Sequence, residues 1–267
     1  MTDPAGSGVD LRAEIGRVAM REDLGSHRRA YAAAKPEIRR YVIEGVATLV
    51  AALVSVFGFV SGVAVVAIVG VTGMLMVGGR LLWDLLWLVY IHGRNRRVRL
   101  DLYERGLVVM VGGKARCVRY DTTVLRRNIV EHVDSPAANQ VSYAYTLVDT
   151  VGDPIVLRHG IERPEEWGPE IDRAITAAQL PRAVEVLAAD GCLDFEYFWM
   201  TRAEIGAGER SEPWSQVTGI ALSAGWVSVG VAGESAPLES LPVSLIPNFT
   251  IFRTLAERMR AEHARSV

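Results

Sequence analysis

The most uneven pattern of hydrophobic and polar positions is the run from Gly45 to Gly79, which contains no ionisable side chain. A helix needs about 20 apolar residues to cross about 30 Å of hydrocarbon, so this run is too long for one ordinary span. The glycine-bearing segment 58–62 falls where a tight turn would lie. The pattern predicts a transmembrane helical hairpin in residues 41–93, with spans at about 41–59 and 62–83 and an aromatic interfacial extension.

Basic residues crowd both ends of this run. Those nearest to the predicted spans are Arg39, Arg40, Arg94, Arg96, Arg97 and Arg99. Arginine and lysine favour the cytoplasmic side of a membrane, and their presence at both ends requires an even number of spans. We therefore expect a multi-pass cell-membrane protein with two spans and both termini in the cytoplasm. Each basic side chain near an anionic leaflet would add about 1 kcal/mol of attraction.

Small residues recur along both predicted spans. Ala47, Ala51 and Ser55 are spaced by four residues on the first span, and Gly62, Gly70 and Gly73 offer a similar face on the second. Small residues let helices approach closely in a bilayer, either within the hairpin or between protomers of a homo-oligomer. Almost no polar group is available to line a lumen, so the pattern argues against a channel.

Residues 1–40 are predicted to form a cytoplasmic N-terminal segment with an amphipathic helix. Leu11, Ile15 and Val18 recur on one helical face, and Gly25 could end the helix. Such a helix could lie on the membrane surface or dock on the soluble part of the protein. The mixed charges on its other face favour docking, because surface-binding helices usually have a more cationic polar face.

The period of hydrophobic positions changes after the apolar run. Residues 98–103 alternate as in a strand, and Gly112-Gly113 is typical of a hairpin turn. Further β-rich stretches precede a helix that starts at Pro164 and a short second helix that Gly191 closes. A second round of strands follows and ends in a helix capped by Asn248. These patterns predict an α+β membrane protein.

The two soluble rounds repeat at an offset of about ninety residues. We match Asp101 with Asp194 at the start of corresponding strands, and Tyr120 with Trp214. About seven short antiparallel strands and a C-terminal helix in each round resemble a pleckstrin-homology-like (PH-like) domain. The predicted domains are residues 94–190 and 191–267.

Several segments resemble a group of bacterial, mainly actinobacterial, membrane proteins of unknown function with tandem PH-like domains. These segments are Leu24-Gly25, residues 102–109, Tyr120-Asp121 and the closing stretch 246–252. The chain departs from that group at Tyr120, where tryptophan would be expected. The resemblance implies the fold and the architecture, and it supplies no catalytic residue.

Charge and reactive residues narrow the possible functions further. A formal net charge of -2 gives no overall basic field, which argues against a nucleic-acid partner. The two cysteines, Cys117 and Cys192, lack metal or redox spacing, and the five histidines are scattered. We therefore predict no metal, no cofactor and no catalytic residue. Trp214 could form the floor of a ligand site or belong to the core.

The candidate lipid-headgroup residues are Lys114, Arg116 and Arg119, around the first predicted hairpin turn. In PH domains the loop between the first strands often holds lipid phosphates, so the resemblance implies anionic lipids as possible ligands. The alternative is a solvated loop beside an anionic leaflet.

We expect a non-enzymatic scaffold or sensor that is anchored in the lipid bilayer and presents tandem PH-like domains at the cytoplasmic membrane face. These domains would bind an unknown protein partner or lipid head groups. The alternative is a membrane-bound enzyme with a site between the two soluble domains. A deep cleft containing His132, His159 or clustered carboxylates would favour the enzyme.

Overall fold

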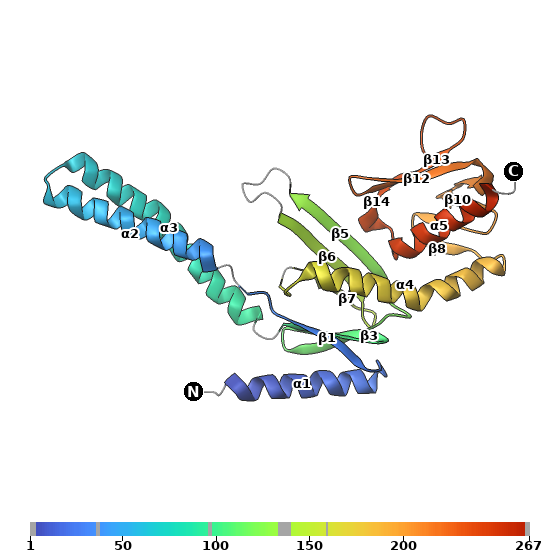
Figure 1. Cartoon of the computed structure of the whole chain (residues 1–267), viewed down its shortest axis with the longest axis horizontal. Helices are drawn as coiled ribbons and strands as arrows, with labels where there is room; N and C mark the ends of the chain where they lie inside the picture. The colour runs from blue at the N-terminus through green and yellow to red at the C-terminus, as the bar shows by residue number, and fades with distance from the viewer. Residues whose placement is uncertain (1–3, 36–37, 96–97, 133–139, 159, 265–267) are drawn as a thin grey trace. The chain divides into compact units, whose positions relative to one another are not determined.

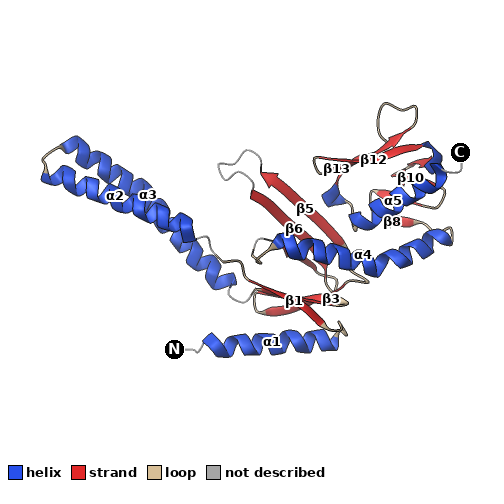
Figure 2. Cartoon of the chain, in the orientation of Figure 1, coloured by secondary structure: helices blue, strands red, loops and turns tan. Residues whose placement is uncertain are grey.

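The computed structural model describes residues 4–35, 38–95, 98–132, 140–158 and 160–264 (Figure 1). The chain divides into two compact units. One unit is Ala33–Arg97, and the other combines Met1–Ala32 with Val98–Val267. The smaller unit is therefore inserted into the sequence of the larger one. Figure 2 shows that the smaller unit is helical, whereas the larger one is mixed α+β.

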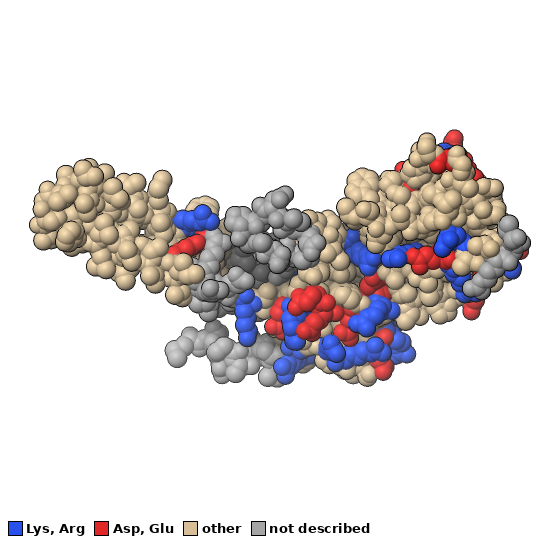
Figure 3. All heavy atoms as spheres, turned by 45° about the horizontal axis from the view of Figure 1, so that its top comes forward, with Lys and Arg blue, Asp and Glu red and all other residues tan. Residues whose placement is uncertain are grey.

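The smaller unit is a hairpin of two helices, α2 (Ile38–Val60) and α3 (Ala64–Asn95). Both contain stretches long and apolar enough to cross a membrane, Tyr41–Val60 and Ala64–Tyr90. Most of their large apolar side chains are exposed, and Figure 3 shows few charged side chains over this unit. The predicted turn is confirmed, and α3 runs without a break through the predicted interfacial extension.

Small residues set the contact between α2 and α3. The backbone of Gly58 lies so close to that of Ala67 that a methyl group at Gly58 would collide with it. A methyl group added to Gly70 would lie 2.5 Å from the Ser55 backbone nitrogen. The small residues therefore pack the two helices within one hairpin, which was one of the two predicted uses.

The first half of the larger unit contains two antiparallel sheets and a helix. Its four-stranded sheet has the order β1 (His27–Ala32), β2 (Arg99–Tyr103), β3 (Gly106–Val111), β4 (Lys114–Arg119). Its three-stranded sheet has the order β5 (Leu125–His132), β6 (Gln140–Val148), β7 (Pro154–Leu157). Helix α4 (Pro164–Ala188) follows.

Strand β1 was not predicted, because it lies before the helical hairpin in the sequence. It pairs antiparallel with β2, with Tyr31 opposite Leu100 and Ala32 opposite Arg99. Only Tyr31 of this strand is buried, so the segment has no alternating apolar pattern. The N-terminal segment therefore supplies an edge strand to a sheet whose other strands lie after the hairpin.

Helix α1 (Pro4–Arg21) packs on this first sheet. Ile15 and Ala19 are buried together with Val108, Met110 and Cys117. Of the two placements left open by the sequence, the docked one is confirmed, since these apolar side chains lose their contact with water.

The second half of the larger unit repeats the same plan. Its four-stranded sheet contains β8 (Leu193–Phe195), β9 (Phe198–Met200), β10 (Glu204–Ala207) and β11 (Arg210–Pro213). Its three-stranded sheet contains β12 (Val217–Ser223), β13 (Trp226–Val231) and β14 (Ser240–Pro242). Two short 3-10 helices, η1 (Trp214–Gln216) and η2 (Val243–Leu245), precede and follow that sheet, and α5 (Phe249–Ala264) ends the half.

The strand order confirms one predicted equivalence and corrects another. Tyr120 and Trp214 each follow the fourth strand of their half, and both are buried in a core. The Trp214 indole donates to the Thr201 carbonyl at 3.0 Å, so Trp214 is a core residue. Asp101 lies on the second strand of its half and Asp194 on the first, so that match was wrong.

Helix α4 joins the two halves. The sequence predicted two helices here, but the helix is continuous and contains Pro181. Trp167 and Ile171 are buried in the first core, whereas Val184 and Leu187 pack in the second. A proline inside a helix costs about 3 kcal/mol, and burial of both apolar stripes offsets that cost.

Candidate functional site

Lys114, Arg116 and Arg119 all lie on β4, but not in the loop that was predicted. The Gly112-Gly113 turn joins the third and fourth strands of the sheet. The connection between the first two strands is the helical hairpin itself. Lys114, Arg116 and Arg119 therefore do not lie beside the loop between the first two strands, because the unpredicted β1 is the first strand of the sheet.

Arg116 is held by the β6–β7 turn. Its Nε donates to Asp149 Oδ2 at 2.8 Å, and its Nη atoms donate to the carbonyls of Asp153 and Pro154. Burial opposes ionisation of Asp149, but the Arg116 hydrogen bond and two backbone N–H groups lower its pKa below the usual value. Arg116 therefore fastens this turn to β4.

Arg119 lies at the other end of β4. Its guanidinium donates to both carboxylate oxygens of Asp121 and to the carbonyl of Glu22. The hydrogen bond from Arg119 lowers the pKa of Asp121. Arg119 therefore fixes the end of α1 and does not share a site with Lys114, whose side chain is exposed.

Among the predicted juxtamembrane basic residues, only the side chain of Arg99 is described. Those of Arg39, Arg40, Arg94, Arg96 and Arg97 lie outside the described residues. Arg99 donates to the buried carboxylate of Asp101 at 2.6 and 2.9 Å, and His27 Nε2 lies 2.9 Å from the same group. Arg99 therefore pairs within β2, and His27 provides the contact from β1 to the same carboxylate.

The strand register places the β3–β4 turn and both connections to the helical hairpin at the same end of the first sheet. Ala32, Arg99, Met110 and Ala115 form one row across the four strands. The chain enters the helical hairpin after Ala32 and returns from it before Arg99. The turn that follows Met110 on β3 therefore lies at the sheet end from which both connections to the hairpin leave. We call this end of the sheet the tether end.

A polar seam connects the two halves, and the sequence reasoning missed it. The Asn248 backbone N–H donates to the Leu125 carbonyl, and its side-chain oxygen accepts the Leu125 N–H, both at 2.8 Å. Asn248 also donates to Gln179, which donates to the carbonyls of Tyr120 and Thr123. The Asn248 side chain therefore links the halves instead of capping α5 as predicted.

A cleft of about 370 Å³ lies beside this seam. Its polar lining includes Asp121, Gln179, Arg182 and Asp194. Arg119 keeps Asp121 ionised, and Asp194 accepts the Glu196 N–H. The lining residues described for this cleft include neither histidine nor cysteine. The side chains of His132 and His159 lie outside the described residues.

A larger groove, of about 700 Å³, lies between β5 and the β12–β13 turn. Ile129 and Val130 on one side and Leu222 and Trp226 on the other are all more than 40% exposed. Strand β5 is an edge strand of its sheet in the described part of the chain. The groove therefore offers apolar side chains beside a sheet edge.

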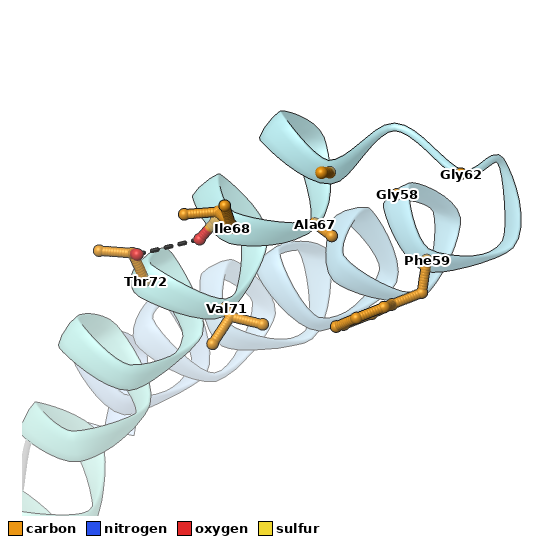
Figure 4. A pocket seen from close by; sticks show the side chains of 8 residues that line it. Gly58, Phe59, Gly62, Ala67, Ile68, Val71 and Thr72 are labelled. Carbon is orange, nitrogen blue, oxygen red and sulfur yellow. Dashed lines mark hydrogen bonds between the residues drawn. The ribbon is translucent and has the colours of Figure 1, made fainter.

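A third hollow, of about 470 Å³, lies at the turn of the helical hairpin (Figure 4). Gly58, Ala67 and Val71 line it, with Phe59 and Ile68 beside them. The Thr72 hydroxyl donates to the Ile68 carbonyl at 2.9 Å, so it is already satisfied. The hollow is thus suited to hydrocarbon.

Potential metal ligands are not grouped among the described residues: no three His, Cys, Asp or Glu side chains come together there.

The described portion of the chain is an α+β protein with two helices long and apolar enough to span a membrane. Its larger unit contains two similar halves. A family model described as a family of unknown function (DUF6585) matches residues 12–265, and the chain belongs to that family. No curated protein and no solved structure matches the chain.

Proposed function

We propose that this protein is a membrane-anchored, non-enzymatic scaffold or sensor. It presents two PH-like domains at the cytoplasmic face of the cell membrane, where they bind a protein partner or lipid head groups. One observation carries the proposal: the apolar hairpin is inserted between two paired strands, β1 and β2. The anchor and the first domain are thus connected at two neighbouring points.

The exposed surface of the helical hairpin supports a place in the bilayer. Leu49, Phe57 and Val60 are at least 60% exposed, and many neighbouring apolar side chains resemble them. Exposed apolar surface on this scale is unfavourable in water and suited to hydrocarbon. The basic residues at both ends support a cytoplasmic position for both termini.

The repeated strand order supports PH-like domains. Each half has a four-stranded and a three-stranded antiparallel sheet followed by a helix, and apolar side chains of that helix fill the core. A helix placed in this way closes the opening left by curved antiparallel sheets. We also propose that the chain is related to actinobacterial membrane proteins of this architecture.

The alternative, a membrane-bound enzyme, would use the cleft beside Asn248. The described lining offers two carboxylates but no nucleophile next to a base. The groove beside β5 is larger and more apolar, and it suits a protein partner better. The scaffold is therefore the stronger proposal.

The native cysteines provide a test of the topology. Cys192 is exposed, whereas Cys117 is buried and burial raises the pKa of its thiol to about 12. A membrane-impermeant maleimide should label the protein only after cells are lysed, and Cys192→Ser should abolish the labelling. Labelling of Cys192 in intact cells would overturn the cytoplasmic placement.

A photo-crosslinking residue in place of Trp226 tests the binding role in living cells. We expect a specific adduct from this position in the groove. The matched control replaces Glu209, which is exposed on the β10–β11 turn, and should give none. Equal adducts at both positions, or none at either, would count against binding in this groove.

A further inference from the structure

We infer that the turn from Val111 to Lys114 docks on the phosphate groups of anionic phospholipids in the inner leaflet. The inference rests on the proposed function, and it names both the contact surface and the ligand class. Val111 ends β3 and is 45% exposed, Gly112 and Gly113 form the turn, and Lys114 starts β4 with an exposed side chain. An apolar group beside a cation suits the boundary between head groups and hydrocarbon.

The strand register is the first support. Val111 and Lys114 are paired one position beyond the row formed by Ala32, Arg99, Met110 and Ala115. Neighbouring strands lie about 4.8 Å apart, so the turn is only about 10 Å to the side of β2, where the chain returns from the hairpin. The turn thus lies at the tether end of the sheet.

The short connections are the second support. Residues 33–37 join β1 to α2, and residues 96–98 join α3 to β2. Five extended residues span at most about 17 Å. Helix α2 starts only three residues before the apolar stretch Tyr41–Val60, which adds about 5 Å. The chain between the tether end and the apolar stretch is therefore short, about 20 Å when fully extended.

The pairing of charges is the third support. At the far end of the sheet, Arg105 pairs with Asp23 and Arg119 with Asp121. At the tether end, Arg99 pairs with Asp101, and Glu162 accepts the Ala32 N–H. Lys35 and Lys114 are exposed, and neither forms an ion pair within the described residues.

Lys114 therefore gives the tether end a cationic group that a leaflet phosphate can bind. Attraction to an anionic surface acts over a Debye length of about 8–10 Å, which is shorter than the extended length of the connections, so Lys114 binds the leaflet only when the turn lies against it. Of the three basic residues on β4, Lys114 is the one that binds the phosphate, because Arg116 and Arg119 are already bound to carboxylates.

The test uses the full chain in lipid nanodiscs. Val111→Cys in a Cys192→Ser background carries a solvatochromic fluorophore, and buried Cys117 stays unlabelled. Discs contain either phosphatidylcholine alone or phosphatidylcholine with phosphatidylglycerol. We expect a blue shift of the emission in the anionic discs. Lys114→Glu should abolish the shift, whereas Arg202→Glu, the same charge change at an exposed site in the second half, should preserve it.

A fluorophore at Thr122→Cys, which is exposed beyond the far end of β4, should show no shift in either disc. Equal emission from position 111 in both discs, or a shift that survives Lys114→Glu, would overturn the inference. Normal emission from position 122 in each variant excludes unfolding as the cause. The side of the cell membrane does not enter this measurement, so docking can fail while the Cys192 labelling still supports the proposed function.

Discussion

The two halves of the larger unit share one strand order and differ in the connection between their first two strands. In the second half, Glu196 and Tyr197 form a two-residue turn between β8 and β9. In the first half, residues 33–98 occupy the same place. The ends of a hairpin connection are neighbours, and closure entropy rises slowly with loop length, so this position tolerates a long insertion. The comparison shows how this fold accommodates a long helical insertion without losing a strand.

The cores of the two halves also differ in their aromatic residues. Tyr31, Tyr120 and Tyr145 are buried in the first core. In the second core, Phe252 stacks on Phe198 with ring centroids 5.0 Å apart. The first core therefore contains groups that can ionise, whereas the aromatic cluster of the second contains none.

The largest expected effect follows removal of β1. A fragment of residues 98–267 lacks β1 and α1, which exposes Leu100, Leu102 and the apolar face under α1. We expect the first half of this fragment to be unfolded in hydrogen-exchange mass spectrometry. The control replaces residues 33–98 by Asn-Gly, a two-residue turn that suits the paired Ala32 and Arg99, and it should fold. Equal protection in both proteins would show that β1 is dispensable.

The next effect is a selective loss of stability at alkaline pH. Burial raises the pKa of Tyr145 and of Cys117 to about 12, and it raises that of Tyr120 as well. The unfolded chain releases these protons at lower pH than the folded one. Stability is therefore complete below about pH 9 and falls as pH rises toward 12, by about 1.4 kcal/mol for each unit of pKa difference.

Urea unfolding near pH 8 and near pH 11 checks this expectation for the first half. Tyr145→Phe should reduce the loss between the two pH values, because it removes one ionising group. Tyr197 in the second half is exposed, so Tyr197→Phe is the matched control and should leave the loss unchanged. If Tyr145→Phe and Tyr197→Phe lost equal stability between pH 8 and pH 11, the expected difference between the two halves would be contradicted.

Two crowded glycines on β3 and β10 give a smaller, graded effect. A methyl group at Gly106 would collide with the Val118 carbonyl, which belongs to the neighbouring strand. At Gly206 it would meet the Trp199 ring, which is partly exposed and can move. Gly106→Ala should lower the free energy of unfolding by about 3 kcal/mol and Gly206→Ala by about 1 kcal/mol. Chemical denaturation that gave the reverse order would show that β3 can shift more easily than the ring.

A loss smaller than that of Gly106→Ala is expected at the polar seam that connects the two halves. Asn248→Ala removes the acceptor of the Leu125 N–H and should cost about 1–2 kcal/mol. Asn248→Asp keeps the acceptor and loses the donor to Gln179, so we expect a smaller loss. Both losses of stability can be measured from denaturation curves of the protein in which Asn-Gly replaces residues 33–98. No difference between the variants would show that the Leu125 bond contributes little.

Much of the secondary structure could be predicted from local patterns. The apolar run, the turn near Gly62 and the alternation after Val98 each depend on neighbours in the sequence. The residues of β1 carry no such pattern, because an edge strand with one buried side chain needs none. The role of Asn248 was missed for a related reason: a cap residue and a cross-linking residue look alike before the partner strand is known.

The sequence by itself determined the apolar hairpin and the repeat, since each follows from the pattern of hydrophobic positions along the chain. Only the tertiary structure decided that β1 completes the first sheet and that α4 serves two cores. It also decided that Arg116 and Arg119 are bound to carboxylates while Lys114 stays exposed at the tether end. The physical reason is that strand pairing and ion pairs join residues distant in sequence, and no local period records which partner each will meet.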